Sequence, residues 1–460
     1  MTPRLFYPLL FVAVFLLRLA QTNITWVEEG YPLAAAAEML RGKALYNEIW
    51  FDKPPLFPAF YMLWGATTGI PLRLAGALYV LLSAWSIGRL ARYLWSETEE
   101  RLAAALTAFF LTFGIPATVM VIGPDLMLIP IQAAAVLAAW RGQALAAGLI
   151  TGIGMLINGK MLIFLPAVIV LRPAWAVGFL LPQVILLPAA QNYHQQVWAW
   201  GSLYSRDTFL ANPIAEGLQR TANWLGFHSA IVLAAALALK TEPNKRRWLI
   251  WLTCGLIAVT AGFRFAPRYY FLLIPPVLIL AARALPKQKL LAALLLIPLI
   301  RFGPRYLELA ADNLQNKPHQ WRDLAMEQDS RAAAKLTSAP GTILVWGYRP
   351  EIYPLSGHPA ATRFLDSQPL TGVLADRHLT DSRPTAPELA KANRAELIKT
   401  QPDWILDGLG PYNPKLAITE YEDLKPWLTN YHEVARTPGT TLYKIRDSHR
   451  NYQINPTPKP

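Results

Sequence analysis

A long series of apolar segments between residues 5 and 303 constrains the fold of this chain more than any other feature. We count twelve of them. They lie at about residues 5–20, 56–70, 74–93, 101–118, 124–140, 143–158, 161–171, 174–190, 224–240, 248–262, 269–284 and 289–303. Only 16% of the 460 residues are charged, against about 25% in soluble proteins. We therefore predict a polytopic α-helical membrane protein, whose shorter segments are tilted, extended or re-entrant because a spanning helix needs ~20 residues.

Basic residues indicate the orientation in the membrane. The formal net charge is +13, but the Lys and Arg residues separate apolar segments instead of forming a patch with interleaved aromatic residues. This pattern favours membrane lipids over nucleic acid as the partner. The basic cluster within residues 240–247 marks a cytoplasmic loop. Residues 21–55, residues 191–223 and everything after residue 303 are then expected on the outer side.

This orientation requires an odd number of crossings, so we expect eleven or thirteen helices. Twelve segments conflict with this odd number, and the conflict lies at residues 56–70. Either this segment does not cross the membrane fully, or two helices elsewhere have been counted as one segment. The first segment is expected to be retained as a span, because the residues after it, Arg18 to Thr22, offer no small-residue cleavage site. The single cysteine, Cys254, excludes an intramolecular disulfide.

The two outer loops of the transmembrane domain (residues 1–303) have a mixed aromatic and polar character. In the first loop, residues 21–55, the run Tyr31 to Arg41 is a good helix former. We expect this helix to lie along the membrane surface, anchored by Trp26, Tyr31, Tyr46 and Trp50. The second loop, residues 191–223, is expected to lie on the same interface beside the first.

After Pro304 the composition changes, and residues 304–447 are predicted to form a small soluble α/β domain. Helical patterns cover about 319–336 and 387–399, strands are predicted at 342–346 and 404–406, and residues 431–436 and 441–446 form a hairpin around Pro438-Gly439. The polar, proline-rich tail at 448–460 is expected to be disordered.

Ionisable residues between apolar segments mark the candidate site. The first outer loop contains Glu28, Glu29 and Lys53. Ionisable side chains between membrane segments cost free energy and usually mark a functional site. The sequence has no phosphate-cradling glycine loop, no metal-spaced His/Cys set and no Ser-His-Asp order that would indicate another chemistry. We therefore predict an active site at a membrane surface.

Five short motifs, in order, resemble bacterial glycosyltransferases of the GT-C fold. They are Glu28-Glu29-Gly30-Tyr31-Pro32, Lys53-Pro54-Pro55-Leu56, Gly123-Pro124-Asp125, Lys160 in a broken apolar run, and Pro267-Arg268-Tyr269. The similarity is to the branch with protein O-mannosyltransferases and lipid A aminoarabinose transferases, and it extends over residues 5–303. The C-terminal domain is also similar to one found on many such bacterial chains.

The resemblance implies an inverting transferase in the bacterial inner membrane, with its site and C-terminal domain on the periplasmic side. The donor would be a sugar on a polyprenyl-phosphate carrier, and the acceptor a hydroxyl of a lipid, glycan or protein. Glu28 matches the general base, where the family usually has Asp, and Glu29 follows it. Lys53, Arg264 and Arg268, with Tyr269 and Asp125, are the expected substrate and lipid-phosphate ligands, since Arg binds phosphate bidentately and Lys as a point charge. Metal dependence stays open.

Plainer roles are also open for these residues. The two glutamates could be a solvated pair, Lys53 and the arginines could flank spans, Asp125 could cap a helix, and Lys160 could extend its ammonium toward the interface. A transporter or flippase would also have many spans and buried charges, although no internal repeat is detected. A non-catalytic lipid-carrier-binding protein would keep the basic residues without needing the acidic pair.

Overall fold

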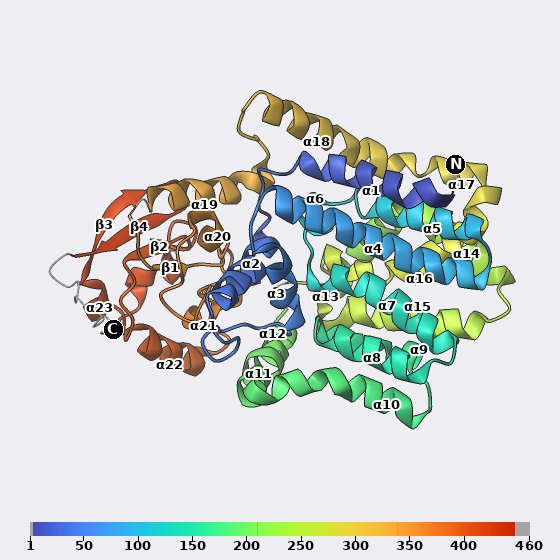
Figure 1. Cartoon of the computed structure of the whole chain (residues 1–460). Helices are drawn as coiled ribbons and strands as arrows, with labels where there is room; N and C mark the ends of the chain where they lie inside the picture. Colours follow the sequence, from blue (N-terminus) through green and yellow to red (C-terminus); the bar gives the residue numbers. More distant parts are fainter. Residues whose placement is uncertain (1–2, 209, 338, 447–460) are drawn as a thin grey trace, which may run out of the picture. The chain divides into compact units, whose positions relative to one another are not determined.

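The computed structural model describes residues 3–446 except 209 and 338, and these residues form two compact units (Figure 1). Unit 1 comprises residues up to Asn47 and Phe51–Trp321, and unit 2 comprises Glu48–Trp50 and residues from Arg322 onward. The predicted boundary at residue 303 differs from this division, because α18 (Leu296–Leu314) continues through Pro304. The tail at 448–460 lies outside the described residues.

Unit 1 is built from helices. Its helices before α18 are α1 (Pro3–Leu19), α2 (Val27–Leu40), α3 (Leu56–Tyr61), α4 (Ile70–Leu94), α5 (Glu97–Phe110), α6 (Pro116–Val119), α7 (Pro124–Trp140), α8 (Ala144–Met155), α9 (Leu165–Val168), α10 (Pro173–Leu180), α11 (Ala190–Tyr193), α12 (Trp200–Arg206), α13 (Pro213–Phe227), α14 (Ser229–Thr241), α15 (Lys245–Thr260), α16 (Ile274–Ala284) and α17 (Lys289–Ala293).

Three helical runs of the described chain are long and apolar enough to cross a membrane, namely Ile70–Leu94, Pro173–Arg206 and Lys289–Leu314. The pair α13 and α14, bent by 86°, is a fourth candidate. Shorter apolar helices lie at Leu5–Leu19, Pro124–Trp140, Ala144–Met155 and Gly159–Val168. These helices agree with a polytopic membrane protein, and the number of eleven to thirteen crossings stays a prediction.

Glycines let helices in this unit approach closely. A Cβ at Gly178 of α10 would meet the Leu145 carbonyl oxygen of α8 at 2.3 Å, and one at Gly148 would meet the Trp175 carbonyl oxygen at 2.0 Å. The backbones of α8 and α10 are therefore in direct contact, as in membrane helices that pack through small residues (Figure 1).

The ambiguous segment at 56–70 forms only the six-residue α3 and a 3-10 turn at Met62–Trp64, ended by left-handed Gly65. Six helical residues rise about 9 Å, far less than the ~30 Å hydrocarbon core. This geometry favours the first of the two alternatives, in which the segment does not cross fully.

The two outer loops differ in part from expectation. Residues 190–206 are helical, continuing α10 into the 34-residue run that ends at Arg206, with a π-helical turn at His194–Ala199. They do lie beside the first loop, since the Gln196 amide contacts the Tyr46 carbonyl and the Phe51 N–H at 2.7 and 2.9 Å. The expected surface anchors are wrong: Trp26, Tyr31 and Tyr46 are at most 3% exposed. They pack inside the protein, with Tyr31 stacked on Phe51.

Unit 2 contains a four-stranded sheet in the order β1-β2-β4-β3. The strands are β1 (Ile343–Trp346), β2 (Trp404–Asp407), β3 (Tyr431–Arg436) and β4 (Thr441–Ile445), close to the predicted positions. β1 and β2 are parallel with Ile343 opposite Trp404, and β4 is antiparallel to both neighbours. The helices are α19 (Ala325–Leu336), α20 (Ile352–Ser356), α21 (Gln368–Thr371), α22 (Pro387–Leu397) and α23 (Lys425–Leu428). Buried Arg349 ties α19 to the hairpin through Asp329 and the Thr440 hydroxyl.

Candidate functional site

The two adjacent glutamates occupy the first turn of α2. The helix begins at Val27, four residues before the predicted start, because the Trp26 N–H donates to Glu29 Oε2 at 3.0 Å and caps the helix end. Successive helical residues point about 100° apart. Glu28 and Glu29 therefore face different surroundings, although they are neighbours in sequence.

Glu29 is fully buried in an ion pair with Arg73 of α4. Both side chains are 0% exposed, and the guanidinium donates to Oε2 at 2.6 Å and to Oε1 at 3.0 Å. Arg73 also donates to the Ile24 carbonyl. Such a bidentate buried pair leaves Glu29 no access to a substrate, so its geometry is that of a structural anchor for the start of α2.

Glu28 points instead to a cluster of alternating charge. Its carboxylate pairs with Arg268, whose Nε lies 3.8 Å from Asp125 Oδ2. Asp125 Oδ1 accepts from Lys160 Nζ at 3.0 Å and from the Asn158 amide at 3.1 Å. The order along this cluster is Glu28, Arg268, Asp125, Lys160. Of the expected site residues, the structure thus brings together Glu28, Asp125, Arg268 and, through Lys160, Tyr269.

Lys160 contacts two of the expected site residues, Asp125 and Tyr269, which its sequence motif did not predict. Its ammonium lies 3.0 Å from the centre of the Tyr269 ring, where a cation is attracted by the aromatic face. The segment carrying it is held by the Asn158 side chain, which accepts from the Lys160 N–H and starts a 3-10 helix. A lone lysine after Asn-Gly in an apolar run was the available signal, but its partner Asp125 is 35 residues away.

Lys53 and Arg264 form a second cationic group around Tyr204. Lys53 Nζ pairs with Asp52 at 2.7 Å and lies 6.0 Å from the Tyr204 ring centre. The Arg264 guanidinium lies 3.9 Å from the same ring and the residue is only 3% exposed. Sequence reasoning did not single out Asp52 or Tyr204.

A tight turn connects the two groups. Gly262, Phe263 and Phe265 have positive φ angles of 74°, 51° and 46°, and such a conformation is costly for a non-glycine residue. The turn presents Arg264 and Arg268 four residues apart, which limits their Cα separation to about 14 Å. Strain of this kind is typical of functional loops.

The two groups combine carboxylates with four cations. Glu28, Asp125 and Asp52 lie beside Lys53, Lys160, Arg264 and Arg268. Several fixed cations in a partly buried setting suit an anion such as a phosphate. Among the described residues, no group of three or more His, Cys, Asp or Glu side chains is arranged to hold a metal ion.

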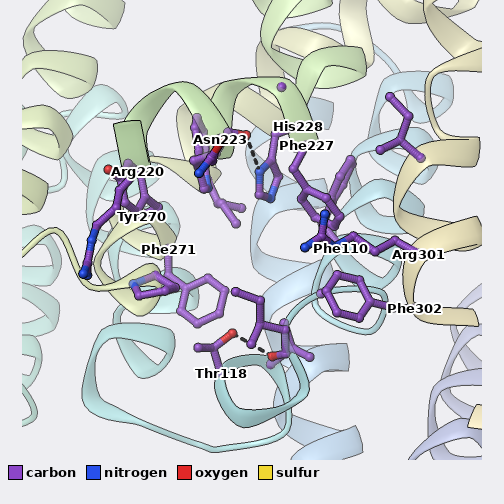
Figure 2. Close-up of a pocket in the computed structure, with 18 of the residues that line it drawn as sticks. Phe110, Thr118, Arg220, Asn223, Phe227, His228, Tyr270, Phe271, Arg301 and Phe302 are labelled. Carbon is purple, nitrogen blue, oxygen red and sulfur yellow. Dashed lines mark hydrogen bonds between the residues drawn. The ribbon is translucent and has the colours of Figure 1, made fainter. Parts of the chain in front are cut away.

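Two cavities open at the site. A small one is lined by Glu28, Asp125 and Arg268. A larger one, of about 650 Å³, shares Thr118 and Phe271 with the first (Figure 2). The candidate base therefore lines the small cavity, which meets the large one at Thr118 and Phe271.

No protein-family model and no curated protein matches the chain by sequence. Solved structures do match it. The crystal structure of ArnT from Cupriavidus metallidurans bound to undecaprenyl phosphate matches 96% of this chain and 98% of its own, at 15% identity and a TM-score of 0.62. The chain has the GT-C fold.

Two further structures with the GT-C fold agree. The apo form of the same ArnT matches 97% of this chain and 99% of its own, at 15% identity and a TM-score of 0.58. The apo oligosaccharyltransferase of Archaeoglobus fulgidus matches 97% of this chain and 75% of its own, at 14% identity and a TM-score of 0.51. The resemblance read from the sequence motifs is thus confirmed for the fold.

Proposed function

We propose that this protein is a glycosyltransferase that moves a sugar from a polyprenyl-phosphate carrier to an acceptor hydroxyl on the outer face of the bacterial cytoplasmic membrane. The observation that carries the proposal is the pairing of Glu28 with Arg268 beside Asp125, in the wall of the small cavity that adjoins the large one. The fold shared with an ArnT bound to undecaprenyl phosphate supports a carrier of this kind.

Glu28 is the proposed general base. It lies on the first turn of α2 and is about one third exposed, so an acceptor hydroxyl can reach it. In the reaction the hydroxyl oxygen attacks the anomeric carbon, its proton passes to Glu28, and the bond from that carbon to the phosphate oxygen breaks. The electron pair leaves with the phosphate, and a single displacement inverts the configuration.

Arg268 is the proposed link between carrier binding and catalysis. A phosphate on the carrier would compete with Glu28 for the Arg268 guanidinium, because both groups are anions that accept charge-assisted hydrogen bonds from it. Binding of the donor then releases Glu28 toward the acceptor. Lys53 and Arg264 supply the other fixed cations that stabilise the departing phosphate. Asp125 and Lys160 hold Arg268 and Tyr269 in place.

A transfer assay with two matched variants tests this proposal. Glu28→Gln removes the base, and Glu97→Gln removes a comparably exposed glutamate that also lies in a first helical turn and pairs with an arginine, Arg101. The variants are purified and assayed with a panel of polyprenyl-phosphate sugars. We expect Glu28→Gln to lose about 10²- to 10⁴-fold in rate, the usual contribution of a general base, and Glu97→Gln to keep it.

The alternatives give different results. A transporter or a carrier-binding protein has no covalent product, so wild-type protein would release no glycosylated acceptor from any donor. Equal rates in wild type and Glu28→Gln would exclude Glu28 as the base. Loss of transfer with carrier binding retained supports the proposal.

A further inference from the structure

A π-helical turn at His194–Ala199 joins α11 to α12 within the helical run Pro173–Arg206 (Figure 1). Such turns are rare, and they occur mostly as single-turn bulges inside α-helices, frequently at functional sites. The proposed reaction uses none of its residues. The buried side chain of this turn is Gln196, which is 5% exposed.

The Gln196 amide holds the two ends of one stretch of the first outer loop. Its Nε2 donates to the Tyr46 carbonyl at 2.7 Å, and its Oε1 accepts from the Phe51 N–H at 2.9 Å. Tyr46 and Phe51 are 2% and 0% exposed, so these backbone groups are costly without a partner. The partner must both donate and accept, which an amide does and a carboxylate or an apolar side chain does not.

The same loop is fixed again where it reaches Lys53. Tyr46 has a positive φ of 69°, which is uncommon for a residue other than glycine, and its hydroxyl donates to the Lys53 carbonyl at 2.8 Å. The Asp52 N–H donates to the Tyr31 hydroxyl at 3.4 Å, and the Tyr31 ring stacks on Phe51 with ring centres 4.5 Å apart. The backbone is therefore held at three successive residues, 51, 52 and 53.

The π-helical turn also packs against the segment that carries Lys160. A Cβ at Gly159 would meet the Trp198 ring at 3.2 Å, so Trp198 covers the residue directly before Lys160. One turn thus contacts the chain beside Lys53 and the chain beside Lys160, which are distant in sequence. A glutamine that only stabilised the fold would have no particular effect on either cation, and this difference can be measured.

We propose that Gln196 is a positioning residue for the carrier phosphate, and that its amide holds the loop from Tyr46 to Phe51 so that Lys53 is presented to the donor. This role rests on the proposed function. Gln196 bonds to backbone groups and acts through Lys53 without contacting the substrate. Without the amide the strained backbone at Tyr46 relaxes and Lys53 moves, while Glu28 stays on α2. The KM for the donor then rises more than kcat changes.

A double-mutant cycle in the full-length protein tests this role. Gln196→Leu is compared with Gln183→Leu, a glutamine of the same helical run whose amide donates to the Gly152 and Phe179 carbonyls at 3.0 and 3.3 Å. Each is made in the wild type and in Lys53→Gln. Undecaprenyl phosphate binding in neutral detergent is measured by native mass spectrometry, and amide hydrogen exchange is followed at residues 46–53.

We expect Gln196→Leu to speed exchange at residues 46–53 and to weaken undecaprenyl phosphate binding roughly 3- to 10-fold, the upper value being loss of the whole Lys53 contact. In the Lys53→Gln background the same change should weaken binding by less than about twofold, because the contact that it supports is already gone. Gln183→Leu should change neither measurement in either background.

Three results would overturn the role of Gln196. They are unchanged exchange in Gln196→Leu, equal weakening of binding in both backgrounds, and the same effect from Gln183→Leu. Wild-type protein that binds no undecaprenyl phosphate would overturn both this role and the proposed function. If the wild type binds the carrier yet transfers no sugar, the proposed transferase alone fails, and the binding cycle still decides the role of Gln196.

A smaller change tests the same loop if Gln196→Leu does not fold. Tyr46→Phe removes the hydroxyl that donates to the Lys53 carbonyl, and Tyr79→Phe removes a buried hydroxyl that donates to the Met127 carbonyl at 2.7 Å. Tyr46→Phe should weaken undecaprenyl phosphate binding in the wild type and not in Lys53→Gln, whereas Tyr79→Phe should bind like its parent in both. Equal effects of the two variants would contradict the positioning of Lys53 by this loop.

Discussion

Replacing Glu29 by Gln separates the structural glutamate from Glu28, the proposed catalytic one. The change removes the charge that neutralises Arg73 while keeping the size of the side chain. Arg73 is 0% exposed and keeps only the Ile24 carbonyl as an unchanged acceptor. Removing one partner of a buried ion pair costs about 3–5 kcal/mol, because the other charge stays buried without compensation. Since Gln still offers an amide oxygen to Arg73, we expect Glu29→Gln to lower the free energy of unfolding by about 3 kcal/mol, the lower end of this range.

The expected loss of stability corresponds to a decrease in the melting temperature of unit 1. Unfolding entropy of about 2.1 cal/mol/K per residue, over the roughly 320 residues of unit 1, makes about 3 kcal/mol equivalent to about 5 °C. Glu28 is 35% and Arg268 30% exposed, so Glu28→Gln should shift the melting temperature by less than about 1.5 °C.

A thiol-reactive fluorogenic dye provides the assay. Cys254 is the single cysteine and is buried in α15, so it reacts when unit 1 unfolds. The double variant Glu29→Met/Arg73→Met should recover part of the stability, because an apolar pair leaves no buried charge, although the Trp26 N–H and the Ile24 carbonyl lose their partners. If Glu29→Gln melted like wild type yet lost transfer as Glu28→Gln does, the division of roles between the two glutamates would be refuted.

Two further predictions concern the phosphate cations and unit 2. Lys53→Gln should raise the KM for the polyprenyl-phosphate donor about 10-fold with a smaller effect on kcat, since one charge-assisted contact is lost; a change in kcat alone would contradict this role. In unit 2, burial lowers the pKa of His378 from 6.5 to about 4, so the folded state holds it neutral while the unfolded state binds a proton below pH 6.5. The free energy of unfolding of unit 2 therefore falls by about 2 kcal/mol between pH 7.5 and pH 5. Pulse proteolysis in urea at the two pH values measures this difference, and His378→Gln should reduce it.

Local patterns predicted local structure well. The strands of unit 2 lie within one residue of their predicted bounds because β-branched and aromatic runs are bounded by Gly and Pro. Helix α2 begins four residues before its predicted start at Tyr31. The residue directly before Val27 is Trp26, not a Ser, Thr, Asp or Asn that would mark this start, and the cap comes instead from Glu29, whose side chain accepts from the Trp26 N–H.

Pairings across the chain were beyond sequence reasoning. Glu29 and Arg73 are 44 residues apart, and Glu28 and Arg268 are 240 apart. No spacing rule indicates which of two adjacent carboxylates turns inward. The resemblance predicts Glu28 from its motif position, and the helix geometry favours the same residue, since Glu29 meets a fully buried arginine and Glu28 a partly exposed one.

The central claim is that Arg268 exchanges Glu28 for the carrier phosphate. A structure of the full chain with undecaprenyl phosphate bound tests it most directly. The account predicts a phosphate oxygen on the Arg268 guanidinium, with Lys53 on the same phosphate and the Glu28 carboxylate turned toward the large cavity. A phosphate bound away from Arg268, with the pair of Glu28 and Arg268 intact, would contradict it.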